Sequence, residues 1–173
     1  MNATQERTAQ QLLIVFGDIT RFTVNACAKP DVEIAEIMHE YYQRAGALVR
    51  ASNGRIVKFM GDAFLAVWSA VDAPRGAASL VAIKRGVDAF FAERQWDSRL
   101  VVKAHFGEAV AGAFGDDGRF DLIGNDVNIA ATLPARTIAL SPEAFRCLAQ
   151  GDRTSWKKHT PQVVYIPADD RRP

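Results

Sequence analysis

The chain has 173 residues, a length that suits one domain large enough to bury a core without disulfides or metals. Hydrophobic residues make up 49% of it and charged residues 24%, which is atypical of disordered and fibrous chains. With 21 Lys and Arg against 20 Asp and Glu, the net charge is +1, so a surface dedicated to nucleic acid or membranes is not expected.

The cysteines, histidines and terminal segments carry no zinc-binding or targeting signal. Cys27 and Cys147 lie far apart in the sequence and the 3 histidines are scattered singly, so no zinc site is expected. Residues 1–11 are polar, and no apolar run approaches the roughly 18 residues that a membrane helix needs. We therefore expect a cytoplasmic chain without membrane contact, with a flexible segment at 1–11, one domain at 12–166 and a C-terminal tail at 167–173.

The first two thirds of the chain show strand and helix patterns in the order βαββαβ. A short apolar run is followed by a segment with apolar residues at helical spacing, and two β-type runs on either side of Gly61-Asp62 predict a hairpin. The expected elements are Leu12–Phe16, Asp31–Arg50, Arg55–Met60, Ala63–Trp68, Ala73–Phe91 and Leu100–Phe106. This order predicts an α+β fold with a ferredoxin-like core and its helices on one face of the sheet.

The rest of the chain predicts additional C-terminal α/β elements. Gly107-Glu108 suggests the turn of another hairpin, between Leu100–Phe106 and Ala109–Phe114. A short helix at Asp126–Leu133 is expected to stop at Pro134. The other expected elements are strands at Phe120–Ile123, Thr137–Leu140 and Gln162–Ile166 and a helix at Pro142–Gln150.

Two aspartates each follow a glycine at the end of an apolar run. Asp18 ends the first strand and Asp62 lies in the expected hairpin, so a ferredoxin-like sheet should bring both carboxylates to one edge. Two carboxylates on a rigid edge suit Mg²⁺, which completes its octahedron with water and phosphates. The alternative is that Asp18 caps a helical turn and that Asp62 merely supplies a β-turn.

Four segments, in order, resemble the catalytic domain of class III nucleotidyl cyclases. They are FGDITRFT at 16–23, KFMGDAF at 58–64, HFGEAVAG at 105–112 and FDLIGNDVNIA at 120–130. The resemblance spans about residues 12–166, nearly the whole chain. It implies a ferredoxin-like core and a head-to-tail homodimer, or a pair with a related cyclase domain, with active sites at the interface.

The resemblance also implies roles for residues near the strand ends. Asp18 and Asp62 would hold two Mg²⁺ or Mn²⁺ ions, assisted by the carbonyl of Ile19. Backbone N–H groups around Phe22 and Thr23 would face the triphosphate, as the start of a helix can. The ribose 3′-oxygen of the substrate would attack the α-phosphorus, and pyrophosphate would leave.

Lys58 and Asp121 match the two base-recognition positions of the family. An ammonium facing N1 of adenine and a carboxylate facing its 6-amino group satisfy both groups, whereas guanine reverses this edge, so the pair predicts ATP over GTP. The resemblance assigns these residues, with Asn128 to orient the ribose or the transition state, to the chain opposite Asp18 and Asp62. Without the resemblance, a solvated strand lysine, a strand-edge carboxylate and a capping or surface asparagine are the plainer interpretations.

A lysine near the C-terminus completes the implied set. Lys157 or Lys158 corresponds to the phosphate-contacting lysine of the family, and counting back from Tyr165 favours Lys157. The alternative is a solvated basic pair in a loop, because adjacent charges usually face water.

The chain departs from the family at Thr132, where members usually carry an arginine four residues after the asparagine. That arginine neutralises charge that grows on the phosphate in the transition state, and removing a comparable group costs about 10²–10³ in rate. A neutral hydroxyl cannot replace a forked cation. Arg136 lies one helical turn further on, although Pro134 should disrupt a straight extension. We therefore expect a weak cyclase, a site that uses Arg136 or a basic residue of a partner, or a degenerate module.

Three functions follow from these observations. The leading hypothesis is an adenylate cyclase that makes cyclic AMP from ATP with divalent metal ions. The alternative, motivated by Thr132, is a catalytically degenerate cyclase-homology domain that binds nucleotide or dimerises as a regulatory module. A palm-type polymerase or cyclic-dinucleotide synthase also has a sheet edge with two aspartates, but gives the Asp121–Asn128 block no role.

Overall fold

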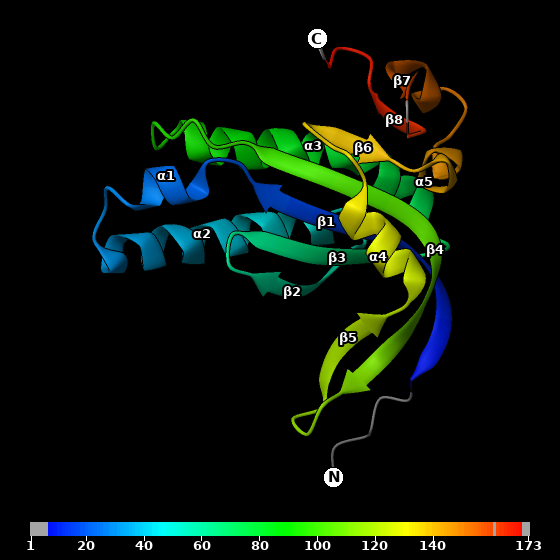
Figure 1. Ribbon diagram of the computed structural model, residues 1–173, viewed down its shortest axis with the longest axis horizontal. Coiled ribbons are helices and arrows are strands. Elements are labelled where there is room, and N and C mark those ends of the chain that lie inside the picture. The colour runs from blue at the N-terminus through cyan, green and yellow to red at the C-terminus, as the bar shows by residue number, and fades with distance from the viewer. Residues whose placement is uncertain (1–6, 161, 171–173) are drawn as a thin grey trace.

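The core of the fold is a βαββαβ unit, which confirms the predicted class. The computed structural model describes residues 7–160 and 162–170. Its core strands follow the antiparallel order β2-β3-β1-β4, and helices α2 and α3 cover one face of the sheet (Figure 1). The elements of this unit are β1 (Thr8–Ile19), α2 (Asp31–Arg50), β2 (Arg55–Met60), β3 (Ala63–Ser69), α3 (Ala73–Ala92) and β4 (Leu100–Phe114).

A C-terminal extension continues the sheet beyond β4. Strand β6 pairs with β4 in parallel, β8 and β7 follow it, and β5 folds back along the outer part of β4 (Figure 1). Its elements are β5 (Arg119–Ile123), α4 (Asn125–Thr132), β6 (Ile138–Leu140), α5 (Pro142–Cys147), the 3₁₀ turn η1 (Asp152–Ser155), β7 (Trp156–His159) and β8 (Val164–Pro167). The short helix α1 (Phe22–Ala26) lies earlier in the chain, between β1 and α2.

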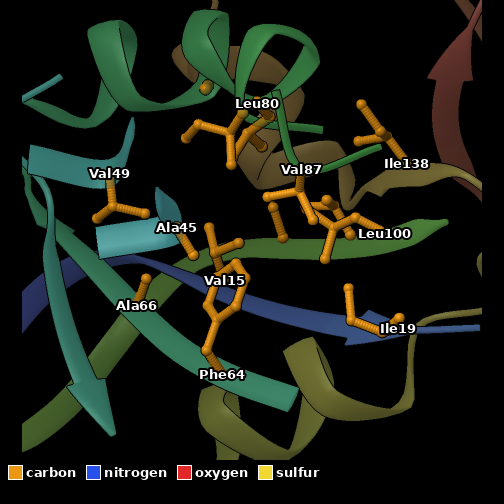
Figure 2. Packing of buried hydrophobic residues seen from close by; sticks show 14 of the residues in the cluster. Val15, Ile19, Ala45, Val49, Phe64, Ala66, Leu80, Val87, Leu100 and Ile138 are labelled. Carbon is orange, nitrogen blue, oxygen red and sulfur yellow. The ribbon is translucent and has the colours of Figure 1, made fainter. Parts of the chain in front are cut away.

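Both faces of the central strands are buried, which explains the continuous apolar run of β1. Figure 2 shows Val15 of β1 in the main cluster with Val49 of α2 and Leu80 of α3. Ile14 points to the opposite face, where it belongs to a second cluster with Ala130 of α4. The sheet is therefore held between the helix pair α2 and α3 and the smaller helix α4.

The expected hairpin at Gly107-Glu108 is wrong, because β4 is one continuous strand. Both residues pair with β1, opposite Leu12 and Gln11. Strand β1 pairs with Leu100–Ala111 of β4, and β5 pairs with Val110–Phe114, so the chain reverses only at 115–118, where Gly115 and Gly118 have φ of 73° and 63°. Glycine is therefore needed at position 107 for its contact with α4 and not for a turn.

Other differences lie near the ends of the chain. Strand β1 begins at Thr8 and pairs there with Ala111, inside the segment expected to be flexible. The pattern also missed α1, η1 and β7, and α5 ends at Cys147 rather than at Gln150. Residues 1–6 and 171–173, which belong to the expected terminal segments, lie outside the described residues. Within 7–160 and 162–170, none of the helices combines the length and the apolar character needed to cross a bilayer.

Candidate active site

Asp18 and Asp62 are neighbours at one end of strands β1 and β3. Gly17 pairs with Phe64 in the antiparallel register, so Asp18 comes next to Ala63 and to the turn residue Asp62. Burial raises the pKa of the Asp62 carboxyl above its ordinary value, a hydrogen bond from its own backbone opposes this, and the negative charge of Asp18 raises the pKa further. The fold therefore places two carboxylates within electrostatic reach of each other.

Two tyrosines of α2 hold the turn that carries Asp62. The hydroxyl of Tyr41 donates to the carbonyl of Asp62 at 3.1 Å, and that of Tyr42 donates to the carbonyl of Gly61 at 2.7 Å. Burial, and then the charge of Asp62, raises the pKa of Tyr41, so its hydroxyl stays protonated and remains a donor. Gly61 has φ of 65°, which a side chain would disfavour. No sequence pattern indicated this support, because both tyrosines belong to an ordinary amphipathic helix.

The carboxylate pair fits a divalent cation. Among residues 7–160 and 162–170, no lysine, arginine or histidine forms an ion pair with Asp18 or Asp62. That part of the chain also contains no cluster of three or more histidine, cysteine or acidic side chains suited to a metal. Two carboxylates with no protein cation match an ion that takes few protein ligands and completes its shell with water and phosphate oxygens.

The helical turn α1 follows directly after Asp18 and Ile19. Its N-cap is Arg21, in the left-handed conformation with φ of 56° and without a side-chain capping bond, so Asp18 is not its cap. The guanidinium of Arg21 pairs with Asp97 at 2.7 Å. The ring of Phe22 packs on Trp96, with centroids 5.8 Å apart, whereas Thr23 is exposed. These contacts fix the turn beside the carboxylates.

Lys58 and Asp121 form an ion pair on the other face of the sheet. The Nζ of Lys58 on β2 lies 2.6 Å from an Oδ of Asp121 on β5, although 63 residues separate them in sequence. The neighbouring Arg55 stacks on the ring of Phe120, with its guanidinium carbon 3.7 Å from the centroid. The side chains of Lys58 and Asp121 stay 42% and 31% exposed, so a ligand can reach the pair.

Helix α4 carries Asn128 on its exposed side. The hydroxyl of Thr132 donates to the carbonyl of Asn128 at 2.8 Å, so it is used within the helix. The helix ends at Thr132, and Leu133 is buried with extended ψ of 135°. Arg136 therefore lies in an exposed connection rather than one turn further along the same helix.

Lys157 and Lys158 lie in the strand β7, so the alternative interpretation of a basic pair in a loop is wrong about the loop. Because β7 and β2 are the two ends of the sheet order, the single chain does not bring Lys157 beside Lys58 (Figure 1). The Nζ of Lys157 donates to the carbonyl of Asp170 at 2.7 Å. Adjacent residues of a strand point to opposite faces, so Lys157 and Lys158 face different sides.

Comparisons with known proteins identify the family of this chain. A family model described as Adenylate and Guanylate cyclase catalytic domain matches residues 4–168. Adenylate cyclase 1 of Rhizobium meliloti (strain 1021) is 27% identical over 72% of this chain, and an adenylate cyclase of Anabaena cylindrica is 24% identical over 75%. This chain spans only 20% and 28% of the length of these two relatives.

Solved structures show the same fold at low sequence identity. The adenylyl cyclase CyaB from P. aeruginosa superposes with a TM-score of 0.81 and 18% identity, over 96% of this chain and 98% of that one. The guanylyl cyclase Cya2 gives a TM-score of 0.76 and 19% identity, over 94% of this chain and 92% of that one. The same architecture thus occurs in proteins named for either purine.

Proposed function

Since this chain belongs to the adenylate and guanylate cyclase catalytic domain family, we propose that it converts ATP to 3′,5′-cyclic AMP and pyrophosphate at sites shared by two copies of the chain. The observation that carries the choice of ATP is the 2.6 Å pairing of Lys58 with Asp121. The two relatives named adenylate cyclase, at 27% and 24% identity, support the same choice.

The base is selected by one donor and one acceptor. The ammonium of Lys58 donates to N1 of adenine, and the carboxylate of Asp121 accepts from the 6-amino group. Guanine presents a donor and an acceptor in the opposite order, so both protein groups would lose their partners in a partly buried site. Arg55 on Phe120 keeps β5 against β2, so the spacing of the two groups is set before the nucleotide arrives.

Asp18 and Asp62 are the residues that would hold divalent metal ions, with the carbonyl of Ile19 as a further ligand. Such ions would activate the ribose 3′-hydroxyl and stabilise charge on the phosphates. The tyrosines of α2 keep the Asp62 turn in place, and the backbone N–H groups near Phe22 and Thr23 face the triphosphate.

A complete site needs a second chain, in this proposal. Lys58 pairs with Asp121 on the face of the sheet opposite α2, and among the described residues Lys58 forms no ion pair with Asp18 or Asp62. In a head-to-tail pair, one chain supplies the carboxylates and the other supplies Lys58, Asp121 and Asn128. Asn128 orients the ribose, and Lys157 contacts phosphate once its bond to the Asp170 carbonyl opens.

A second candidate function is a regulatory module that dimerises or binds nucleotide without turnover. The hydroxyl of Thr132 is bonded within α4 and supplies no positive charge. Arg136 lies beyond the end of that helix, so it takes the place of a transition-state arginine only if the connection moves. This observation favours slow catalysis or none.

One assay separates the two functions. The purified chain is incubated with Mn²⁺ and ATP over a wide range of protein concentrations, and cyclic AMP is measured. The proposal predicts cyclic AMP whose rate per chain falls on dilution, because the sites dissociate with the dimer. Absence of cyclic AMP at every concentration, with dimers present, would establish the regulatory alternative.

Mixing two inactive variants tests the shared site. Asp62→Ala and Asn128→Ala chains damage different halves of each site, so a heterodimer keeps one intact site and regains part of the activity. Failure of rescue in proven heterodimers would contradict sites built from two chains.

A further inference from the structure

Helix α4 has little apolar contact to fix its position on the sheet. It has 8 residues, of which Ala130 is the buried one and Val127 packs partly against the second cluster. Its N-cap, Gly124, offers no side-chain capping bond. A short helix with one buried residue needs other contacts if Asn128 is to be held for catalysis.

Polar groups of β4 supply contacts at both ends of α4. At the C-terminal end, the Nζ of Lys103 donates to the carbonyl of Ala131 at 2.8 Å. At the N-terminal end, the backbone N–H of Glu108 donates to an Oδ of Asp126 at 2.7 Å. The other Oδ of Asp126 faces the Nε2 of His105 at 3.5 Å. The carboxylate of Asp126 therefore contacts β4 rather than the N–H groups of its own helix.

The sequence of β4 is adapted to this contact. Lys103, His105 and Gly107 alternate along the strand and so point to one face, towards α4. A Cβ at Gly107 would lie 2.1 Å from an Oδ of Asp126, so only glycine leaves room for that carboxylate. This is the reason for a glycine inside a continuous strand, where it is otherwise unfavourable.

His105 is itself fixed from the other side. It is 5% exposed, and its Nδ1 lies 2.8 Å from the hydroxyl of Ser141, the N-cap of α5. The Oγ of Ser141 also accepts from the N–H of Ala144 at 3.1 Å. The imidazole thus has one orientation, and a buried, hydrogen-bonded side chain is a firm support for Asp126.

We propose that Asp126 is a positioning residue: its carboxylate, held by the Glu108 amide and His105, fixes α4 and thereby sets where Asn128 lies. This inference rests on the proposed cyclase function. The Asp126 carboxylate is directed at β4, so its loss should lower kcat through a displaced Asn128. It should change KM for ATP little, because Lys58 and Asp121 lie on other elements.

The test compares Asp126→Ala, Asp126→Asn and Asn128→Ala in the full chain, with Glu143→Ala as the matched control. Glu143 faces the Nδ1 of His105 at 3.7 Å but belongs to α5, so its removal strips a carboxylate from the same histidine without touching α4. We expect Asp126→Ala to lower kcat by about tenfold or more, since a lost charge-assisted hydrogen bond has that weight. Asp126→Asn, whose amide oxygen still accepts from Glu108, should restore most of kcat, and Glu143→Ala should keep it.

Hydrogen exchange of the Glu108 amide supplies a readout that is independent of activity. It should accelerate in Asp126→Ala and stay slow in Asp126→Asn, because the backbone N–H of Glu108 donates to that side chain. If Asp126→Ala fails to fold, Lys103→Met removes the other anchor of α4 and should lower kcat by about fivefold.

The outcomes distinguish this inference from the proposed function. If Asn128→Ala destroys activity while Asp126→Ala and Lys103→Met leave kcat unchanged, the positioning role is wrong and the cyclase proposal stands. If the unaltered chain forms no cyclic AMP, the proposed function itself is wrong. If the chain is active and Asn128→Ala leaves turnover unchanged, Asn128 is not a catalytic residue and the positioning role of Asp126 is wrong. A loss of kcat in Glu143→Ala equal to that in Asp126→Ala would show a general effect of His105 and overturn the role of Asp126.

Discussion

Two partly exposed aspartates of this chain, Asp62 and Asp121, have opposite surroundings. Asp62 lies beside the charge of Asp18 and has a raised pKa, whereas Asp121 accepts from Lys58 at 2.6 Å. Within residues 7–160 and 162–170, no basic side chain forms an ion pair with the first pair, which we propose as a cation site. The second pair is neutral and presents one donor and one acceptor, which suits the edge of a base. The chemistry of a carboxylate is thus set by its neighbours, and one residue type serves two purposes in one sheet.

The largest expected effect comes from removing the negative site. Asp18→Asn and Asp62→Asn should each lower metal-dependent cyclic AMP formation by about 10³ or more, because the ions would lose a charged ligand. Turnover is measured with Mn²⁺ and ATP. Asp117→Asn, in the turn between β4 and β5, is the control and should keep activity. Unchanged turnover in both Asp18→Asn and Asp62→Asn would refute the proposal that these two aspartates hold the metal ions.

Exchanging the donor and the acceptor at Lys58 and Asp121 should change the selectivity between ATP and GTP rather than abolish turnover. In Lys58→Glu with Asp121→Cys, the acceptor replaces the donor, so the ratio of kcat/KM for ATP over GTP should fall by about 10². Competition between the two nucleotides measures this ratio directly. A ratio equal to that of the unaltered chain would show that the pair does not contact the base.

Adding a positive charge at position 132 of α4 should accelerate cyclic AMP formation. Thr132→Arg places a guanidinium on the exposed side of α4, and we expect kcat to rise by about tenfold, below the roughly 10²–10³ that a comparable group contributes in an evolved site. Thr132→Lys is the matched variant and should give a smaller gain, since an ammonium lacks the forked geometry. A chain whose kcat does not respond to either change obtains its cation elsewhere or needs none.

The smallest effect concerns stability and pH without metal. Because the pKa of Asp62 is raised in the folded state, ionising it costs stability, and the cost develops as pH rises from the unfolded pKa through the folded one. In EDTA, Asp62→Asn should therefore melt on the order of 1–2 °C above the unaltered chain at neutral pH, and the difference should vanish in acid. Mn²⁺ should stabilise only the unaltered chain. A difference in melting temperature that does not depend on pH would show that ionisation of Asp62 is not its cause.

The ferredoxin-like core and the closeness of Asp18 to Asp62 could be predicted from the sequence pattern. Apolar periodicity located β1 and α2, and the turn at Gly61-Asp62 followed from local propensities. Bringing Lys58 to Asp121 required the family resemblance, because no local pattern links residues 63 positions apart.

The errors arose where a tertiary contact outweighed a local signal. Gly107 suggested a turn, but β1 pairs with β4 on both sides of this glycine and Asp126 occupies the space above it. The roles of Tyr41 and Tyr42 were hidden because a hydroxyl that bonds a distant turn leaves the helical pattern unchanged. Such contacts depend on three-dimensional proximity, which periodicity does not encode.

Binding of Mn²⁺, followed by electron paramagnetic resonance with a non-reactive ATP analogue present, tests the central comparison most directly. The unaltered chain and Asp121→Asn should both bind the ion, since Asp121 is already neutralised by Lys58. Asp62→Asn should lose most of that binding. Equal Mn²⁺ affinity in Asp62→Asn and the unaltered chain would contradict the assignment of the Asp18 and Asp62 pair as the cation site.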